Sequence, residues 1–410
     1  MRTLRRWAAF AAVIAGASAA CTELKSSAGD GPAPDATEGE EEGGEETSGA
    51  DSGRRDAARD GDVEEDPPTR GDGGTKPVCT ETTCPVNVLQ KDLHGPVAVA
   101  VDATHVYWVE VSSKIPDAGG YGQLVRLPKT STCTQRSCYE LYDRLLVTGE
   151  LEGQYIYPTR LALGKNDVCY AQSYNADAFH TIRCFALADP KRRVLENGEG
   201  QVNDLSIDAT GARWSINSSA AGAADGEIQG CLLASCTVAT LAAKRVHPNA
   251  VTSDGKQVYW SELGAGSMSG SVLSGGPDGG AVPLATGRAD PVSARVFGDH
   301  VYWIDRSAKK VLRVRTSGSG AVEVIATTDD RPFALAVDAS GVYWASSGPL
   351  PTSLYGSVAH APRAPNGKVT TMLTNISNVW NLATDESSVY VVAVGAKLGE
   401  GRLLRIAKTR

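Results

Sequence analysis

The sequence contains few of the groups and motifs on which catalysis usually depends. Only six histidines occur among 410 residues, and they are scattered along the chain. A G-x-S-x-G nucleophile motif, an H-E-x-x-H zinc motif, a phosphate-binding loop and an EF-hand loop are all absent from the sequence. The sequence therefore predicts no cofactor and no metal site, and it contains no motif that would assign an enzymatic activity.

The N-terminal region lacks a hydrophobic run long enough for a permanent transmembrane helix. Residues 7–17 are apolar and follow three arginines, which is the pattern of an export signal but too short to span a bilayer. The small residues 18–20 come directly before Cys21, and this ending resembles a bacterial lipobox. The resemblance implies that residues 1–20 are a signal peptide and that Cys21 is lipidated, which would anchor the chain to a membrane. Cleavage to a soluble form is the alternative.

Large apolar side chains are nearly absent from residues 22–78, which carry 17 acidic and 6 basic side chains. Such a segment cannot bury enough apolar surface to offset the entropy cost of ordering it. We therefore expect residues 21–78 to form a disordered acidic tether that begins at the lipidated cysteine. The remaining residues, 79–410, hold 31 acidic and 31 basic side chains, and this balance argues against a nucleic-acid partner.

Residues 79–410 contain a repeat. The stretch 290–327 has the pattern of four short strands separated by turns, and its central Tyr302 and Trp303 return in variant form six more times, 41 to 62 residues apart. A four-stranded antiparallel sheet cannot bury both of its faces alone, so the copies must stack on one another. Periods of this length with four strands each are typical of propeller blades.

The repeat predicts an all-β fold, a seven-bladed β-propeller of four-stranded antiparallel blades. The expected blades cover residues 95–149, 156–198, 201–242, 247–287, 290–328, 331–375 and 377–407 with 86–91. The seventh copy stops after a third strand at 401–406, so we expect the N-terminal strand to complete that blade and remove the open edge.

The segments VYWVE, VYWSE and VYWID, at 106–110, 258–262 and 301–305, resemble YWTD and NHL-like propeller repeats. The resemblance covers roughly residues 86–410 and implies a propeller fold. The chain as a whole is similar to exported bacterial propeller lipoproteins. The Thr-Asp of the YWTD motif is replaced here, for example by Val109-Glu110 and Ser261-Glu262, so receptor-type ligand binding does not follow from the resemblance.

The eight cysteines beyond Cys21 form close pairs along the sequence, three of them with C-x4-C spacing. In an exported chain an even set of this kind predicts local disulfides. The expected bonds are Cys79–Cys84, Cys133–Cys138, Cys169–Cys184 and Cys231–Cys236. Metal binding is the alternative, but a C-x2-C spacing is missing.

Two recurrent residue types have a structural and a functional interpretation. The Tyr-Trp pairs suit either a stacking platform or the filling of the space between blades, and recurrence in most copies favours filling. An aspartate follows the first strand in most copies, at Asp102, Asp208, Asp254, Asp338 and Asp385. A metal site is one interpretation, but the shared place in a turn favours capping of the turn by the carboxylate.

The residue twelve positions before each Trp303-equivalent marks the entry of the innermost strand, which borders one mouth of the central channel. Residues on either side of this position are chemically diverse, as expected of a binding site. An unselected surface around an empty, water-filled channel is the alternative. The predicted ligand-binding residues are Tyr157, Gln201, His247, Asp290, Arg331, Phe333, Asn378 and Trp380.

Three functions are compatible with these observations. The first is a non-catalytic binding or protein-interaction propeller, a monomer displayed on its lipid-anchored tether in the cell envelope, with a protein, peptide or glycan as partner. The second is a propeller enzyme, lyase-like or metal-dependent lactonase-like, that would use His247, Asp290 and Arg331. The third is a structural envelope component. The expected location is the outer membrane or the cell surface, and a periplasm-facing orientation stays open.

Overall fold

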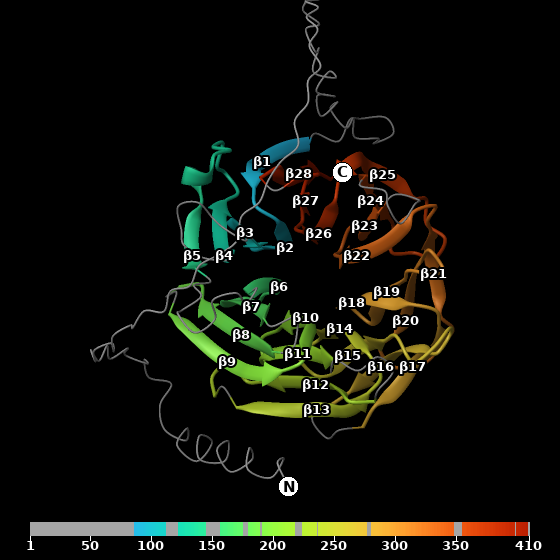
Figure 1. Cartoon of the computed structure of the whole chain (residues 1–410). Coiled ribbons are helices and arrows are strands. Elements are labelled where there is room, and N and C mark those ends of the chain that lie inside the picture. The colour runs from blue at the N-terminus through green and yellow to red at the C-terminus, as the bar shows by residue number, and fades with distance from the viewer. Residues whose placement is uncertain are drawn as a thin grey trace, which may run out of the picture. The chain divides into compact units, whose positions relative to one another are not determined.

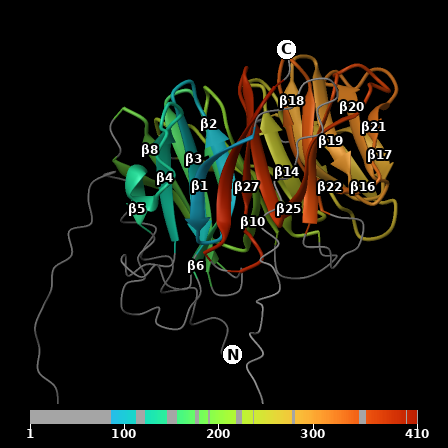
Figure 2. The ribbon, with the colours of Figure 1, turned by 90° about the horizontal axis from the view of Figure 1, so that it is seen from above.

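The computed structural model describes residues 86–111, 122–144, 156–174, 179–188, 191–217, 224–235, 237–276, 280–347, 355–397 and 399–408 (Figure 1). The predicted signal peptide, the tether, the lipidation of Cys21 and the Cys79–Cys84 bond all lie outside these residues. The described residues form 28 strands in seven four-stranded antiparallel sheets arranged in a ring. The predicted seven-bladed propeller is therefore confirmed, and Figure 2 shows the ring edge-on.

The strands of the first four blades follow the chain order from the channel outward. Blade 1 contains β2 (Pro96–Val101), β3 (His105–Val111), β4 (Gly122–Pro128) and β5 (Glu140–Arg144), and the short 3-10 helix η1 (Arg136–Cys138) lies between β4 and β5. Blade 2 contains β6 (Ile156–Leu163), β7 (Asp167–Tyr174), β8 (Phe179–Ala186) and β9 (Arg192–Glu199). Blade 3 contains β10 (Gln201–Ile207), β11 (Ala212–Asn217), β12 (Gly226–Cys231) and β13 (Val238–Arg245). Blade 4 contains β14 (Pro248–Ser253), β15 (Val258–Glu262), β16 (Gly270–Gly275) and β17 (Val282–Arg288).

The last three blades continue the ring. Blade 5 contains β18 (Pro291–Phe297), β19 (His300–Asp305), β20 (Lys310–Arg315) and β21 (Glu323–Thr327). Blade 6 contains β22 (Arg331–Val337), β23 (Val342–Ser347), β24 (Tyr355–Ala361) and β25 (Thr370–Ser377). Blade 7 contains β26 (Val379–Thr384), β27 (Ser388–Ala393), β28 (Gly401–Ala407) and, as its outermost strand, β1 (Val86–Leu93).

The N-terminal strand closes the ring as predicted. β1 pairs antiparallel with β28, with Val86 opposite Ile406 and Gln90 opposite Leu403, and the two strands lie side by side in Figure 1. The side chain of Gln90 is fully buried and donates a hydrogen bond to the carbonyl oxygen of Cys133 in blade 1, at 2.7 Å. The first strand is therefore fixed both to its own blade and to the next one in the ring.

The Tyr-Trp pairs fill the space between blades. Trp303 of β19 is fully buried and packs with Tyr259 and Val272 of blade 4. The neighbouring Tyr302 packs on the other side, in a cluster with Trp344 of blade 6. Successive residues of a strand point to opposite faces, so one Tyr-Trp pair serves two blade interfaces. The predicted core role of these pairs is confirmed.

The five repeated aspartates cap the turns between the first and second strands, as predicted. In each turn the Oδ1 atom accepts hydrogen bonds from two backbone N–H groups, for example those of Ser387 and Ser388 on Asp385, both at 2.8 Å. Burial acts to raise the pKa of Asp385, but hydrogen bonds from Lys129 and the Ser387 N–H outweigh it and lower the pKa to about 2. The pKa of each of the other four carboxyls is also lowered.

The acidic residue two positions after the tryptophan has a structural role that the sequence did not reveal. Glu110 is fully buried, and its carboxylate accepts hydrogen bonds from Trp108 Nε1 at 3.0 Å and from the backbone N–H of His94 at 3.3 Å. Glu262 likewise accepts from Trp260 Nε1 at 2.7 Å and from Arg245 at 2.5 Å. The carboxylate thus connects the core tryptophan to the segment that leads into the blade.

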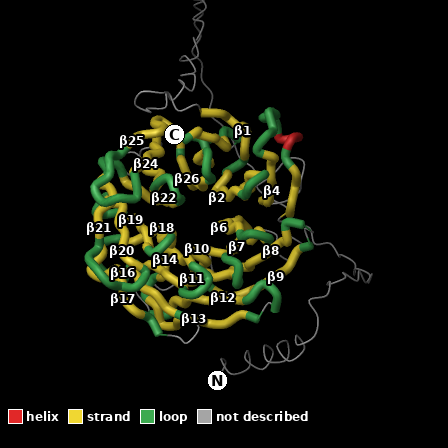
Figure 3. The backbone as a smooth tube through the Cα atoms, turned by 180° about the vertical axis from the view of Figure 1, so that it is seen from behind, coloured by secondary structure: helices red, strands yellow, loops and turns green. Residues whose placement is uncertain are grey.

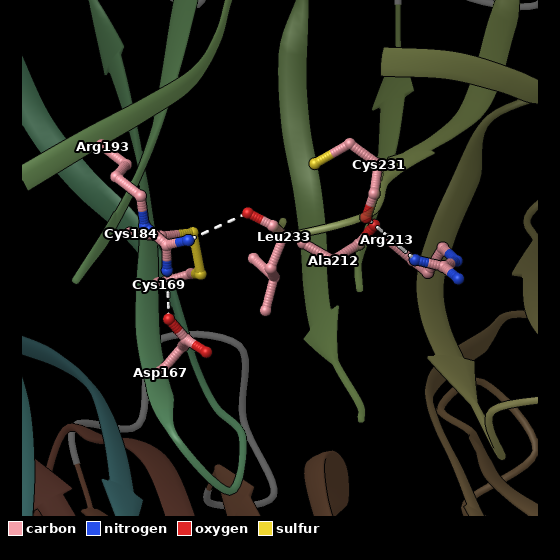
Figure 4. Close-up of a disulfide and its surroundings, with 8 residues drawn as sticks. All are labelled: Asp167, Cys169, Cys184, Arg193, Ala212, Arg213, Cys231 and Leu233. Carbon is pink, nitrogen blue, oxygen red and sulfur yellow. Dashed lines mark hydrogen bonds and ion pairs between the residues drawn. A yellow bond between two sulfur atoms is a disulfide. The ribbon is translucent and has the colours of Figure 1, made fainter. Parts of the chain in front are cut away.

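Two of the four predicted disulfides lie within the described residues and are confirmed. Cys133–Cys138 links the connection between β4 and β5, and Cys169–Cys184 joins the neighbouring strands β7 and β8 (Figure 4). Cys231 is buried in β12, but its predicted partner Cys236 lies outside the described residues. Disulfides persist in oxidising compartments, so the two bonds indicate an extracytoplasmic location for the domain.

Candidate functional site

The innermost strand of every blade contains a β-bulge near its start. The pairing register shifts, for example, between Val202 and Asp204 in β10 and between Val379 and Asn381 in β26. Equivalent shifts occur in the other five inner strands, β2, β6, β14, β18 and β22. A bulge leaves one residue without a partner and re-aims its side chain, so each blade has a variable position at the same height.

The bulges surround a cavity of about 790 Å³ that is lined by the inner strands of all seven blades. Figure 3 shows these strands around the centre of the ring. We define the bulge ring as the residue directly after the strand-entry position of each inner strand, and all seven of its members line the cavity. Six of them are unpaired bulge residues, whereas Val292 pairs with Ile304 directly before the bulge of blade 5. In blade order they are Val97, Thr159, Asn203, Asn249, Val292, Phe333 and Trp380. The cavity volume lies in the range of small-ligand sites.

Three of the eight predicted site residues line this cavity. They are Phe333, Asn378 and Trp380, all contributed by blades 6 and 7. The Trp380 side chain is 51% exposed, although the other five tryptophans of the described residues are fully buried. Asn378 is half-buried and donates a hydrogen bond from Nδ2 to the carbonyl oxygen of Gly395 at 2.7 Å. The structure therefore brings an exposed indole, a phenyl ring and an amide together at one opening.

Four of the other predicted residues lie at or just before the starts of inner strands, outside the lining of this cavity. Gln201 and Arg331 are the first residues of β10 and β22, and His247 and Asp290 directly precede β14 and β18. Asp290 is joined to the lining indirectly, because both of its oxygens accept hydrogen bonds from Arg306, at 2.7 and 3.1 Å, and Arg306 faces the cavity. Tyr157 belongs to β6, but its side chain lies outside what the structure describes. Ligand binding by these residues stays a prediction.

The sequence did not single out several cavity residues that follow the bulges. Arg295 of β18 donates a hydrogen bond to Asp204 of β10 at 2.9 Å, across the intervening blade 4. Asp204 also accepts from the backbone N–H of Val251 at 3.1 Å. Arg160 of β6 donates to the carbonyl oxygens of Thr159 and Asn203. These residues stand two or four positions after the strand-entry position, so the same register could have located them.

The charges of the cavity are largely compensated. The Asp204 carboxylate pairs with Arg295, the Asp290 carboxylate pairs with Arg306, and backbone carbonyls accept from Arg160. The turn aspartates, whose pKa values are lowered, lie at the other end of the inner strands from the bulge ring.

Among the described residues no three His, Cys, Asp or Glu side chains are grouped so that they could hold a metal ion. In the same residues no helix is long and apolar enough to cross a membrane.

The fold and its central cavity define the class of the protein as a seven-bladed β-propeller with an accessible channel. The domain is similar to virginiamycin B lyase from Staphylococcus aureus, with a TM-score of 0.57 and 12% identity over 79% of this chain and 99% of the lyase. A catalytically inactive variant of that lyase with quinupristin, and a streptogramin B lyase structure, each give a TM-score of 0.54 with 10% identity. At this level of identity the similarity concerns the fold alone. No known protein family and no curated protein sequence matches the chain.

Proposed function

We propose that this protein is a non-catalytic binding propeller that presents its channel mouth in the cell envelope. The observation that carries the proposal is the bulge ring. Seven equivalent positions, which the fold leaves free to vary, hold different side chains around one cavity of about 790 Å³. Concave sites with an apolar lining and a few polar groups are the usual form of ligand pockets.

The exposure of Trp380 supports binding. A large aromatic side chain that is 51% exposed keeps much apolar surface in water, and such residues are enriched where proteins contact ligands. Blades 1, 3, 4, 5 and 6 place their tryptophans in the core, whereas Trp380 stands at the bulge of blade 7. Its position therefore serves no packing function that the other blades require.

The location that we propose combines the disulfides with the N-terminal sequence. Two bonds indicate an extracytoplasmic domain. Lipidation of Cys21 would hold the chain at a membrane, and residues 22–78 would act as a spacer between the anchor and the propeller. In this arrangement the propeller would reach partners at a distance from the membrane surface.

The described contacts favour binding over the alternative of a propeller enzyme. Asp290, which the enzyme hypothesis would use as a base, has both oxygens engaged by Arg306 and also accepts from Ser307 at 3.3 Å. Each oxygen of this carboxylate therefore already accepts a hydrogen bond within the protein, which leaves the group less available to a substrate. The lyase-like fold supplies no further argument for catalysis, because the shared identity is only 10–12%.

The experiment that tests the proposal compares retention of envelope components on the immobilised full chain and on two variants. Trp380→Ala should abolish retention of at least one component. Leu232→Ala removes a side chain of similar exposure, 55%, that lies outside the cavity, and it should retain that component. Equal retention by the wild type and by Trp380→Ala would refute a site at the mouth. Conversion of the retained component into a product would favour the enzyme instead.

A further inference from the structure

The structure assigns a chemical class to the ligand of the channel mouth: we propose that the bulge ring binds a neutral sugar chain. One aromatic face of the mouth would stack on a sugar ring, and one polar arc would hydrogen-bond its hydroxyl groups. This inference rests on the proposed binding function and goes beyond it, since binding at the mouth alone does not specify the ligand.

The bulge ring is divided into a polar arc and an apolar arc. The polar arc consists of Thr159, Asn203 and Asn249, from the consecutive blades 2, 3 and 4. The apolar arc consists of the four remaining members, from the consecutive blades 5, 6, 7 and 1: Val292, Phe333, Trp380 and Val97. In a ring of seven blades, blade 7 stands across from blades 3 and 4. A ligand that spans the opening therefore meets an indole on one side and two amides on the other.

The layer behind the bulge ring repeats this division only in part, because blade 5, which belongs to the apolar arc, carries an arginine there. The cavity side of blades 2, 3 and 5 carries Arg160, Asp204 and Arg295. The equivalent lining of blades 1, 6 and 7 is mostly alanine, at positions Ala98, Ala100, Ala334, Ala336 and Ala383, with Asn381 of blade 7 as a polar exception. Blades 2 and 3 thus keep their polar character below the mouth, and blades 1 and 6 keep their apolar character.

The bulge ring holds no charged residue, and the two nearby carboxylates already have partners. Asp204 pairs with Arg295, and Asp290 pairs with Arg306. A charged group of the ligand that lay against the bulge ring would lose water without gaining a counter-charge from any of the seven side chains, which is costly for a buried charge. The ligand segment that contacts the ring is therefore uncharged.

The polar arc suits hydroxyl groups. An amide side chain has both donors and an acceptor, as does a hydroxyl group, so the two are complementary in several orientations. The side chain of Asn249 is half-buried and makes no hydrogen bond to any other described residue. The Thr159 hydroxyl has only a long contact to the carbonyl oxygen of Ala171, at 3.4 Å. These groups can bind a hydroxylated ligand without breaking a strong internal hydrogen bond.

The apolar arc suits a flat, uncharged surface. Trp380 and Tyr355, which are 51% and 57% exposed, both line the cavity. A sugar ring combines an apolar C–H face with a rim of hydroxyl groups in one small rigid unit, so it matches the indole and the amides together. A short peptide would instead bring charged termini or backbone N–H groups, for which the apolar arc has no partners. These features favour a sugar chain over a peptide.

Fluorescence of the mature full chain provides the test, because Trp380 is the one exposed tryptophan among the described residues. The probes are the neutral trisaccharides maltotriose, cellotriose and chitotriose, the acidic trigalacturonic acid, and the blocked tripeptide acetyl-Ala-Leu-Ala-amide. We expect at least one neutral trisaccharide to change the emission in a saturable manner. The acidic sugar should bind at least about ten-fold more weakly than that trisaccharide.

Variants assign the binding to the mouth. Trp380→Phe should remove the emission change while calorimetry still detects the sugar, because a phenyl ring can still stack. Trp380→Ala and Asn249→Ala should each weaken binding by about ten-fold or more, as expected for central contact residues. Leu232→Ala, at an exposed position outside the cavity, should leave binding unchanged.

The inference is overturned if no neutral trisaccharide binds, or if the blocked tripeptide binds more tightly than every trisaccharide. Such a result leaves the proposed function intact when Trp380→Ala still abolishes retention of an envelope component. If Trp380→Ala changes neither sugar binding nor retention, both the inference and the proposed function fail.

Discussion

Lys129 of blade 1 donates a hydrogen bond to Asp385 of blade 7, with 2.6 Å between Nζ and Oδ2. On the other side of the same blade, Lys408, which follows β28, forms an ion pair with Asp338 of blade 6. Both aspartates also cap their own turns. The same carboxylates therefore order a turn and connect neighbouring blades at the place where the ring is closed.

The aspartates that cap the turns predict that the stability of the folded protein is sensitive to acid. The pKa of Asp385 falls from an ordinary 3.8 to about 2 in the folded protein, so folding favours its charged form. This stabilisation is fully present above the unfolded pKa and is lost as the pH falls from about 4 towards 2. We expect the free energy of unfolding, measured by denaturant titration, to be steady near neutral pH and to fall in that window.

The Asp385→Asn variant tests the origin of this acid sensitivity. It should be less stable than the wild type at pH 7, by roughly 1–3 kcal/mol, because Lys129 loses its charged partner. Its loss of stability below pH 4 should be smaller than that of the wild type. A wild type and variant with parallel pH profiles would contradict the role of this carboxyl.

Two tryptophan substitutions should separate stability from binding. Trp303→Ala removes a fully buried side chain between blades 4 and 5 and should lower the free energy of unfolding by about 3–5 kcal/mol. Trp380→Ala removes a side chain that is 51% exposed. It should lower the free energy of unfolding by well under half of the loss expected for Trp303→Ala. Thermal or denaturant melts measure both. A similar loss in both variants would mean that Trp380 is a core residue.

The two described disulfides should differ in their response to reductant. Both cysteines of the Cys169–Cys184 bond are fully buried, whereas Cys133 is exposed. Thiol-disulfide exchange requires access of the attacking thiolate to sulfur. Mild reduction of the folded protein, followed by alkylation and peptide mapping, should modify Cys133 and Cys138 first. Modification of Cys169 before them would contradict the buried position of that bond.

Cys21→Ala should release the protein from the membrane fraction. The substitution removes the only sulfur at the end of the lipobox-like sequence, so the acyl chains would have no attachment point. Fractionation of cells that produce the wild type or the variant measures the change. A wild type that is already soluble would refute lipid anchoring and leave the propeller proposal unaffected.

Deletion of residues 79–93 should leave blade 7 with an exposed edge. The deletion removes β1, including the buried Leu89 and Leu93, so β28 would lose its pairing partner. We expect aggregation or a large loss of thermal stability, since unpaired strand edges associate with other chains. Size-exclusion chromatography and thermal melts measure the outcome. A monomer with the wild-type melting temperature would show that the strand is dispensable.

The fold could be predicted from the sequence because each blade repeats the same physical requirements. Trp303 and its equivalents mark one buried position per blade, and the turn aspartates mark one strand boundary in five of the seven blades. The closing strand followed from the need to cover β28. Glu110 and Glu262 were noted only as departures from a motif, because their hydrogen bonds to the tryptophan become apparent only in three dimensions.

The site could be predicted only in part. The common register located Phe333, Asn378 and Trp380, because a residue at a fixed distance from the core tryptophan has a fixed height in its blade. The bulges escaped notice because all seven inner strands contain one, so the spacing between copies shows no gap. The pair Asp204–Arg295 joins residues that are 91 positions apart, and no local pattern indicates such a contact.

The pairing of β1 with β28 also sets the order of events when the chain folds. During synthesis β1 emerges first and β28 emerges last, so the first strand waits for its partner until almost the whole domain has been made. Contacts between such distant segments slow folding, and until they form they leave unpaired strand edges that can associate with other chains. Loss of the C-terminal strand β28 would therefore leave β1 without a partner and blade 7 with only two paired strands, whereas loss of β1 would leave three.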